Sequence, residues 1–164
     1  MFRDITRKNR QLPNEECLEI LKNEKRGVLS VIGDEGYPYG MPMNHWYNEA
    51  DGAIYFHCGK AGHRLDALKR CDKVSFCVYE QGFREEGQWA WKVNSVIVFG
   101  RARILTDPAD LRSALEALAD KYSPNAHGRE KEIEGALSRV AIIELTPDEI
   151  TGKEAIELVQ QRKG

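Results

Sequence analysis

The sequence predicts a mainly β fold of the α+β class: an antiparallel barrel or strongly curled sheet of five or six strands, with helices at its flanks. Most of the short apolar runs follow one another in hairpin order, with turn residues between them. The longest run, residues 93–105, has Gly100 near its middle, and a glycine there favours a bulge or bend that curls a sheet. The amphipathic helix patterns are apolar on one face only, which is typical of helices that cover a sheet. The order of elements argues against a doubly wound βαβ fold.

Length and composition fit one domain, and we expect residues 1–164 to form it. Charged residues make up 30% of the chain and apolar residues 41%, with a formal net charge of -2. This balance gives no electrostatic basis for binding nucleic acid or an anionic membrane. No apolar run is long enough to span a bilayer, and the N-terminal residues lack the apolar core of a signal peptide. We therefore expect a cytoplasmic protein whose cysteines are reduced thiols.

The N-terminal third begins with a basic segment, residues 1–12, which has little apolar content and predicts an extended arm. Pro13 suits a first helical turn, and an apolar stripe predicts a helix that continues until Gly27 stops it. Residues 28–32 then predict the first strand, and the turn residues 34–36 end it.

Residues 37–47 predict a strand whose two faces differ in kind. The odd positions are Tyr, Tyr, Met, Met, His and Tyr, whereas the even positions include Pro38, Gly40, Pro42 and Asn44. Because proline cannot donate to a ladder, we expect this strand at an edge of the sheet. Gly40 would let a flat ligand approach the backbone, and an edge strand that merely avoids aggregation is the alternative explanation.

A strand, a glycine-bracketed loop and a helix follow, and this stretch carries the main functional signal. Residues 53–58 predict the strand, residues 59–62 the loop, and residues 63–69 a helix with Leu65 and Leu68 on one face. The free N–H groups and the dipole at a helix start favour an anion. The segment therefore predicts a phosphate site at the mouth of the sheet.

Basic side chains at the same loop strengthen this prediction. Lys60, His63 and Arg64 place donors at the helix start, and arginine can bind a phosphate through two hydrogen bonds. A solvated basic turn is the alternative. A metal site is a further alternative, formed by Cys58 with His57, His63 or His45. Its spacing matches no zinc pattern, so no metal is expected.

The rest of the chain supplies three more predicted strands and two helices. Residues 74–79 predict a strand, and the polar loop 81–92 carries two tryptophans, which are more typical of a lid or an interface than of a core. After the long strand, Asp107 caps a helix that extends to Tyr122. A short helix at residues 130–137 and a last strand at residues 140–145 follow; Pro147 is expected to end the strand and to begin a charged tail, residues 147–164.

Six short motifs occur in one order along nearly the whole chain. They are Arg7-Lys8-x-Arg10, Gly36-Tyr37-Pro38-Tyr39-x-x-Pro42-x-Asn44, Tyr55-Phe56-His57, Gly62-x-Arg64-x-x-x-Leu68, Ser95-Val96-Ile97-x-x-Gly100-Arg101-Ala102 and Ile150-Thr151-Gly152-Lys153. Together they resemble the pyridoxamine 5′-phosphate oxidase-like flavoproteins, and more narrowly the nitroimidazole-resistance branch of that family. The loop 81–92 departs from the family's patterns, which leaves the substrate open.

The resemblance implies a six-stranded antiparallel split β-barrel that forms a homodimer, with FMN at the subunit interface. It also implies three groups of cofactor-binding residues, which belong to the proline-containing strand, to the strand-loop-helix segment, and to the start of the long strand in the partner subunit. These residues are Met41, Pro42, Met43, Asn44, His45, then His57, Cys58, Gly59, His63, Arg64, and finally Asn94, Ser95, Val96.

The expected chemistry is that of the flavin, which the protein would bind, orient and tune. One function is an FMN-dependent oxidoreductase that reduces a small aromatic substrate such as a 5-nitroimidazole, with NAD(P)H as a candidate electron source. His45 and His57 are the candidate proton donors, since histidine titrates near neutral pH. The alternative is a non-catalytic or sensory protein that binds flavin, haem or a deazaflavin.

Overall fold

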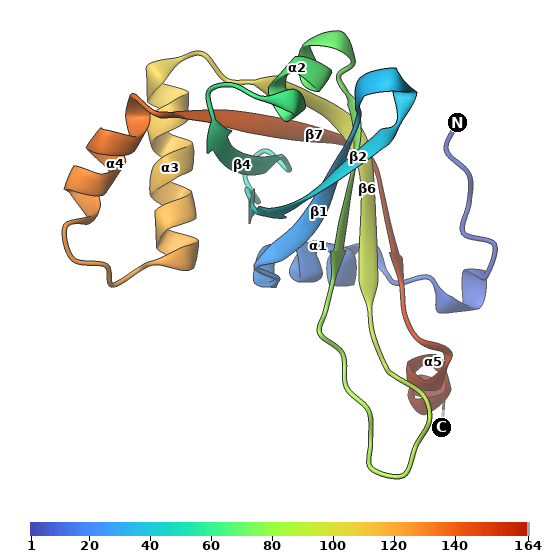
Figure 1. Ribbon diagram of the computed structural model, residues 1–164. Helices are drawn as coiled ribbons and strands as arrows, with labels where there is room; N and C mark the ends of the chain where they lie inside the picture. The colour runs from blue at the N-terminus through green and yellow to red at the C-terminus, as the bar shows by residue number, and fades with distance from the viewer. Residues whose placement is uncertain (164) are drawn as a thin grey trace.

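One curled antiparallel sheet of seven strands dominates the computed structural model, which describes residues 1–163 (Figure 1). The strand order is β2-β1-β5-β6-β7-β4-β3. The mainly β, antiparallel architecture predicted from the sequence is therefore confirmed. The strands are β1 Arg26–Ile32, β2 Pro38–Asn44, β3 Trp46–Tyr47, β4 Ile54–Gly59, β5 Lys73–Tyr79, β6 Ser95–Ile104 and β7 Val140–Lys153.

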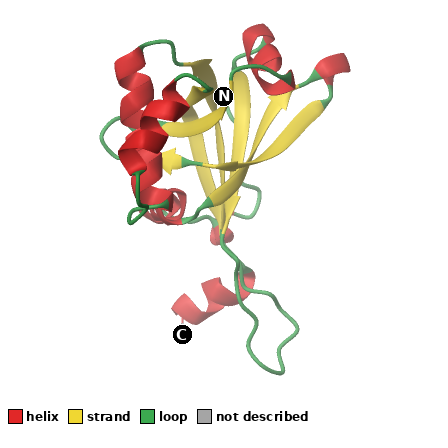
Figure 2. Cartoon of the chain, turned by 60° about the vertical axis from the view of Figure 1, so that its left-hand side comes forward, coloured by secondary structure: helices red, strands yellow, loops and turns green. Residues whose placement is uncertain are grey.

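The helices lie around this sheet, and α3 and α4 gather on one side of it (Figure 2). α1 and α2 lie at opposite ends of the sheet (Figure 1). The helical segments are η1 Lys8–Arg10, α1 Asn14–Asn23, η2 Asp34–Gly36, α2 His63–Arg70, α3 Pro108–Tyr122, α4 Arg129–Leu137 and α5 Ile156–Lys163. Within residues 1–163, none of these helices combines the length and the apolar character that a membrane crossing needs.

Two apolar clusters hold the elements together. The larger one fills the concave side of the sheet, where Leu29, Phe56 and Phe76 are fully buried and side chains of α1 and α2 join them. The smaller one lies on the outer face of β4 and β7, where α3 and α4 cover Ile142. Leu65 and Leu68 of α2 are both buried, as their spacing predicted. Burial of these apolar surfaces is the main source of the stability of the fold.

Within residues 1–163, β2 is an edge strand that pairs with β1 alone, as its prolines predicted. Its odd positions Met41 and Met43 are buried, whereas the flanking Tyr39 is exposed. The predicted strand 37–47 is divided at His45, whose backbone N–H donates to the Tyr122 hydroxyl at 2.8 Å. This interruption of the ladder creates β3 and gives the sheet seven strands where six were expected.

β7 corrects the prediction that Pro147 ends the last strand, because the strand continues to Lys153. Gly100 pairs with Pro147, and the register shifts between Phe99 and Gly100. The resulting bulge interrupts the regular ladder, so the strand can contain a proline at this position. A Cβ atom on residue 100 would overlap the carbonyl oxygen of Thr146, which explains why glycine stands there. The bulge predicted at Gly100 is confirmed, and the predicted tail is a strand over residues 147–153 followed by α5.

The segment 81–92 extends away from the sheet, beside α5 (Figures 1 and 2). Lys92 is buried at its base and donates to Glu85 at 2.6 Å, while Trp89 is 99% exposed. The loop lies at the opposite end of the molecule from α2 (Figure 1). It therefore cannot cover the predicted phosphate site of its own chain.

Candidate functional site

The turn from β4 into α2 forms a pocket of about 220 Å³. Gly62 precedes the helix with φ 125°, a conformation that favours glycine, and no side chain caps the helix start. Cβ atoms on Gly59 or Gly62 would meet open space, so the backbone is accessible on this side. The pocket is lined by Tyr39, Cys58, Gly59, Ala61, Gly62, His63, Arg64 and Leu65.

Arg64 supplies the charge of this pocket. Its Nε donates to Sδ of Met41 at 2.9 Å, which fixes the guanidinium between α2 and β2. Within the part of the chain that the structure describes, Arg64 forms no ion pair, whereas Asp66 in the same turn is paired with Lys69 at 3.2 Å. A guanidinium without a carboxylate partner at a helix start is a suitable anion-binding group.

His63 is held in place by two contacts. Its ring stacks on Tyr39, with centroids 4.3 Å apart, and its Nε2 accepts a hydrogen bond from the backbone N–H of Asp34 at 3.1 Å. Arg70 in turn donates to the Asp34 carboxylate at 2.7 Å. Because Nε2 acts as an acceptor, the other ring nitrogen carries the proton and can donate to a ligand.

The pocket opens onto a seam where the sheet curls so far that β2 approaches β4. The seam is defined by Met41 and Pro42 on β2 and by residues 57–59 on β4. In the part of the chain that the structure describes, β3 pairs only with Ile54 and Tyr55, so the second half of β4 has a free edge on this side. The sheet thus closes without joining its two edges, which leaves backbone available to a ligand between them.

His57 lies on the outer face of β4, exposed, two residues from Gly59. Although the residue is exposed on the strand, burial of part of its ring, and to a smaller extent the positive charge of Arg64, lower its pKa below the usual value. The neighbouring Cys58 faces inward and is buried, and burial raises the pKa of its thiol. At neutral pH the imidazole is therefore neutral and the thiol protonated.

His57 and Asn44 also line a mainly apolar pocket of about 370 Å³ between the sheet and the α3–α4 pair. Its walls come from Leu115 and Leu118 of α3 and from Ile133 of α4. Sequence reasoning missed this pocket. The spacing of Leu115 and Leu118 showed an apolar face on α3, but the pairing of α3 with α4 depends on tertiary contacts.

His45 does not lie at the site. It is 0% exposed, its Nε2 donates to the carbonyl of Leu21 at 2.7 Å, and its ring packs edge-on against Phe76. Burial, together with the charge of Lys121, lowers the pKa of His45 to about 4. The expectation that His45 donates protons to a bound substrate is not supported by this geometry, because a neutral imidazole inside the core cannot reach a surface ligand.

The candidate residues of β6 also lie apart from the phosphate pocket. Ser95 is at the end of β6 that pairs with Lys153, whereas Gly59 pairs with Val140 at the far end of β7. Val96 is fully buried, and Asn94 has a buried side-chain oxygen that finds no partner within residues 1–163. One chain therefore does not bring these residues to Arg64.

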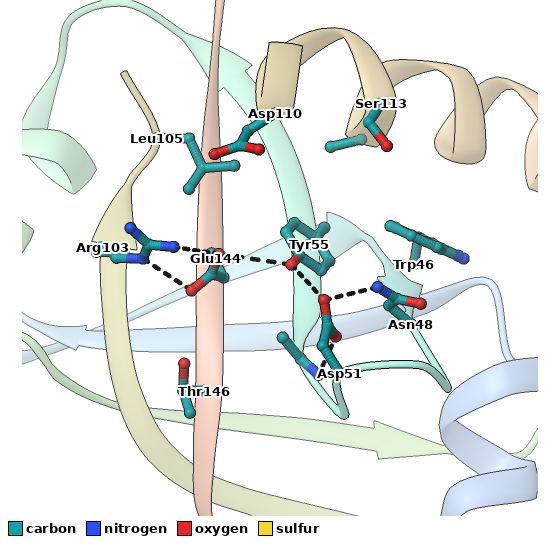
Figure 3. A pocket seen from close by; sticks show the side chains of 12 residues that line it. Trp46, Asn48, Asp51, Tyr55, Arg103, Leu105, Asp110, Ser113, Glu144 and Thr146 are labelled. Carbon is teal, nitrogen blue, oxygen red and sulfur yellow. Dashed lines mark hydrogen bonds and ion pairs between the residues drawn. The ribbon is translucent and has the colours of Figure 1, made fainter. Parts of the chain in front are cut away.

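A larger pocket of about 410 Å³ lies on the other side of α3 (Figure 3). Both oxygens of Glu144 accept hydrogen bonds from Arg103 at 2.8 Å, and Tyr55 donates to Asp51 at 2.8 Å. No local sequence pattern indicates this pocket, since four strands, one turn and one helix each contribute only a few of its residues. Its central polar groups already satisfy one another, so we do not assign a ligand to it.

The residues of the metal alternative lie in different surroundings. Among residues 1–163, no three His, Cys, Asp or Glu side chains are grouped so that they could hold a metal ion. His45 lies in the core, while His63 points to Asp34. All four cysteines are free.

Comparison with known proteins identifies the family of the chain. The family model described as Pyridoxamine 5'-phosphate oxidase matches residues 13–154. No curated protein matches the chain significantly. Among solved structures, 107 chains match it.

Three of these structures illustrate the range of the fold. A candidate 5-nitroimidazole antibiotic resistance protein from Bacteroides thetaiotaomicron is 20% identical, with TM-score 0.73, and the match covers 88% of this chain and 86% of that one. The FAD and heme binding protein from Mycobacterium smegmatis is 19% identical, with TM-score 0.70 and coverage of 94% and 80%. An FAD-binding protein from Mesorhizobium loti is 24% identical, with TM-score 0.63 and coverage of 89% and 97%. At these identities the matches show a shared fold.

Proposed function

Because the chain belongs to the pyridoxamine 5′-phosphate oxidase family, we propose that it is a flavoprotein that binds FMN along the seam between β2 and β4. We further propose that it is an oxidoreductase whose substrate is a small aromatic molecule such as a 5-nitroimidazole. Structural relatives whose names include FAD binding and 5-nitroimidazole resistance support both parts of this proposal.

The observation that carries the proposal is the uncompensated charge of Arg64 at the start of α2. The helix start has no side-chain cap, two accessible glycines flank the loop, and Lys60 is exposed beside it. A phosphate group fits these donors, because it supplies the negative charge that Arg64 lacks and accepts from the free N–H groups. His63, already oriented by Tyr39 and Asp34, adds a donor.

The seam suits the rest of the cofactor. Gly59 and His57 lie on one face of β4 about 7 Å apart, since two residues of a strand span that distance. A ribityl chain that starts at the phosphate pocket would follow this face and bring a flat ring between His57 and the edge of β2. Pro42 is exposed there, and the buried Met41 and Met43 would contribute only their backbone.

The residues of the chain would bind and orient, while FMN when bound would supply electron transfer to the substrate. His57 is the one of the two histidine candidates that remains at the site. As a neutral imidazole it would donate a hydrogen bond to the ring or to the substrate and would not act as a preformed cation. NAD(P)H is the proposed electron source.

We also propose that the protein works as a homodimer. Asn94 and Ser95 are half-buried at the end of β6 remote from Arg64, so they could meet a cofactor only if a second subunit presents them. The unpartnered oxygen of Asn94 is consistent with a ligand or a partner group at that position.

The cofactor is tested by spectroscopy. The purified protein, or the apoprotein titrated with FMN, is expected to show bound flavin absorbance at one FMN per chain. A protein that takes up no FMN but binds haem or a deazaflavin in the same titration would contradict the proposal.

The reaction is tested anaerobically. Bound FMN is reduced chemically, a 5-nitroimidazole is added, and the return of oxidised flavin absorbance is followed. We expect reoxidation to depend on the nitro compound. If the flavin stays reduced, the reductase proposal fails and a binding or sensing role is favoured.

A further inference from the structure

We propose that the pocket between α3 and α4 is the substrate pocket, and that it accepts flat, uncharged aromatic molecules. The pocket is defined by Leu115, Leu118 and Ala119 of α3, Ile133 and Ala136 of α4, and Val140 of β7, with Asn44 and His57 at its mouth. The part of this inference that concerns the reaction rests on the proposed function; the part that concerns binding does not.

The size and lining of the pocket define the class of ligand. Its volume of about 370 Å³ lies within the ~300–1,000 Å³ range of small-molecule sites. Leucine, isoleucine, valine and alanine side chains form most of the wall, so binding is driven by removing apolar surface from water. The pocket lies between two helices and the sheet, and a planar ring can enter between such layers edge-on.

The mouth of the pocket connects it to the seam. His57 lines the pocket, and Gly59, two residues further along the same face of β4, lines the phosphate pocket. Asn44 lies at the end of β2, the strand that forms the other side of the seam. A ring held in the seam would therefore face the opening between Asn44 and His57, which is where a substrate must be exposed to it.

The charges around the pocket disfavour anions. The guanidinium of Arg129 is already bound to the Asp120 carboxylate at 2.9 Å and to the Glu116 carbonyl at 3.0 Å. Glu132, also on the rim, has no ion-pair partner within residues 1–163. Arg129 keeps a buried Nε without a partner within residues 1–163, but its charge is balanced by Asp120. Since His57 is neutral at pH 7, an anionic ligand would meet the unpaired carboxylate of Glu132 with no uncompensated cation beside it.

The polar groups of the pocket can orient an uncharged substrate. The Tyr122 hydroxyl is engaged by the backbone N–H of His45 at 2.8 Å and by the carbonyl of Lys25, so it belongs to the scaffold. The Asn44 side chain accepts from Arg26 at 3.2 Å and retains its amide donors. Asn44 and His57 are therefore the donors on the side of the seam that can bind a nitro group or a ring nitrogen, while Ser123 and the unpartnered Nε of Arg129 add donors elsewhere in the lining.

The experiment compares two substitutions of alanine by phenylalanine on one helix. Ala119→Phe fills the pocket, whereas Ala109→Phe lies on the exposed first turn of α3, outside the lining. Binding of 2-methyl-5-nitroimidazole to the apoprotein and to the FMN-loaded protein is measured by ligand-observed NMR. We expect Ala119→Phe to weaken binding by at least about tenfold and Ala109→Phe to leave it within about twofold.

A second experiment tests the preference for uncharged ligands by comparing the binding of nitrobenzene with that of the anion 4-nitrobenzoate. The uncharged probe is expected to bind at least about tenfold more tightly to the wild-type protein. If circular dichroism shows that Ala119→Phe does not fold, Ala136→Phe on the opposite wall replaces it. Binding that survives both filling substitutions, or a preference for the anion, would overturn the proposal.

FMN titration separates this inference from the proposed function. Both phenylalanine variants are expected to take up FMN as the wild-type protein does, because neither alanine lies in the phosphate pocket. If the wild-type protein takes up no FMN, the proposed function is wrong. The NMR comparison on the apoprotein would still show whether the pocket binds the aromatic probe. Loss of FMN uptake only in Ala119→Phe would show that the pocket holds the cofactor and would contradict a substrate pocket.

Discussion

Arg64 is the residue on which the cofactor proposal depends most directly. Replacing it with alanine would remove the charge-assisted contact that we propose it makes with phosphate, and such a contact contributes about 1.5–3 kcal/mol. We therefore expect FMN to bind about ten- to a hundredfold more weakly to Arg64→Ala, with little change for riboflavin, which has no phosphate. Flavin fluorescence titration measures both constants.

Lys69→Ala is the matched control, since Lys69 lies on the same helix and, among the described residues, forms an ion pair only with Asp66. It should leave both flavin affinities near the wild-type values. Equal losses of FMN and riboflavin affinity in Arg64→Ala would show that the residue supports the fold and that the phosphate lies elsewhere.

The burial of the His45 ring predicts that the stability of the protein depends on pH. The folded state holds the imidazole neutral, with its pKa lowered to about 4, whereas the unfolded chain takes up a proton near pH 6.5. The stability that comes from the buried neutral ring is thus complete above about pH 6.5 and is lost as the pH falls toward 4. The full difference corresponds to roughly 3 kcal/mol.

Urea unfolding at several pH values between 7.5 and 5 measures the contribution of His45 to the free energy of unfolding, because most carboxylates titrate below this range. The wild-type protein should lose stability across this range, and His45→Gln, although less stable at pH 7.5, should show a smaller loss. Parallel pH profiles for the two proteins would mean that another group is responsible.

At the scale of elements, two glycine-to-alanine substitutions are expected to change stability in opposite directions, one at the bulge between β6 and β7 and one in α4. Gly100→Ala places a methyl group against the backbone of Thr146, and such overpacking costs typically 1–3 kcal/mol, so about that loss is expected. Gly135→Ala, in the exposed part of α4, should instead stabilise by about 0.5–1 kcal/mol because alanine favours the helix.

Chemical denaturation of both variants is the measurement. If Gly100→Ala leaves the free energy of unfolding unchanged, the backbone at the bulge can shift to make room for the methyl group. The close approach of β7 would then not explain why residue 100 is glycine. The pair shares one substitution and differs only in the surroundings of the glycine.

The sequence predicted the elements well where the pattern was local. The β4–α2 turn, the apolar face of α3 and the bulge at Gly100 each depend on a few neighbouring residues, and the structure confirms them. Pro147 was misjudged because its tolerance depends on Gly100, almost fifty positions away in the chain. His45 was misjudged for a similar reason: nothing near it in the sequence shows that Leu21 and Phe76 surround it.

At the scale of the whole molecule, the sheet is covered unevenly. α3 and α4 cover the outer face of β4 and β7, while on β6 Ile97 and Phe99 remain 40% exposed and Phe2 stacks on Phe99 at 5.5 Å. Exposed apolar surface of this kind is typical of an interaction surface. It is the surface that we propose a second copy of the chain covers.

Ile97→Asp should therefore weaken the dimer and, with it, FMN binding, because a desolvated carboxylate would lie in the interface. Multi-angle light scattering over a dilution series measures the dimer, with Ile97→Val as the control. A wild-type monomer at micromolar concentration that still binds FMN tightly would contradict a site shared between subunits.

The alternation along β4 has a consequence for how the family could diversify. Ile54, Phe56 and Cys58 face the core and are constrained by packing, while His57 and Gly59 face outward, toward the proposed ligand. Substitutions at the outward positions would change the ligand contacts without disturbing the core, so stability and specificity could vary independently. Because inward positions serve packing and outward positions are free for binding, selection could retain the fold while the ligand changes. The low sequence identities found among the relatives are compatible with such divergence.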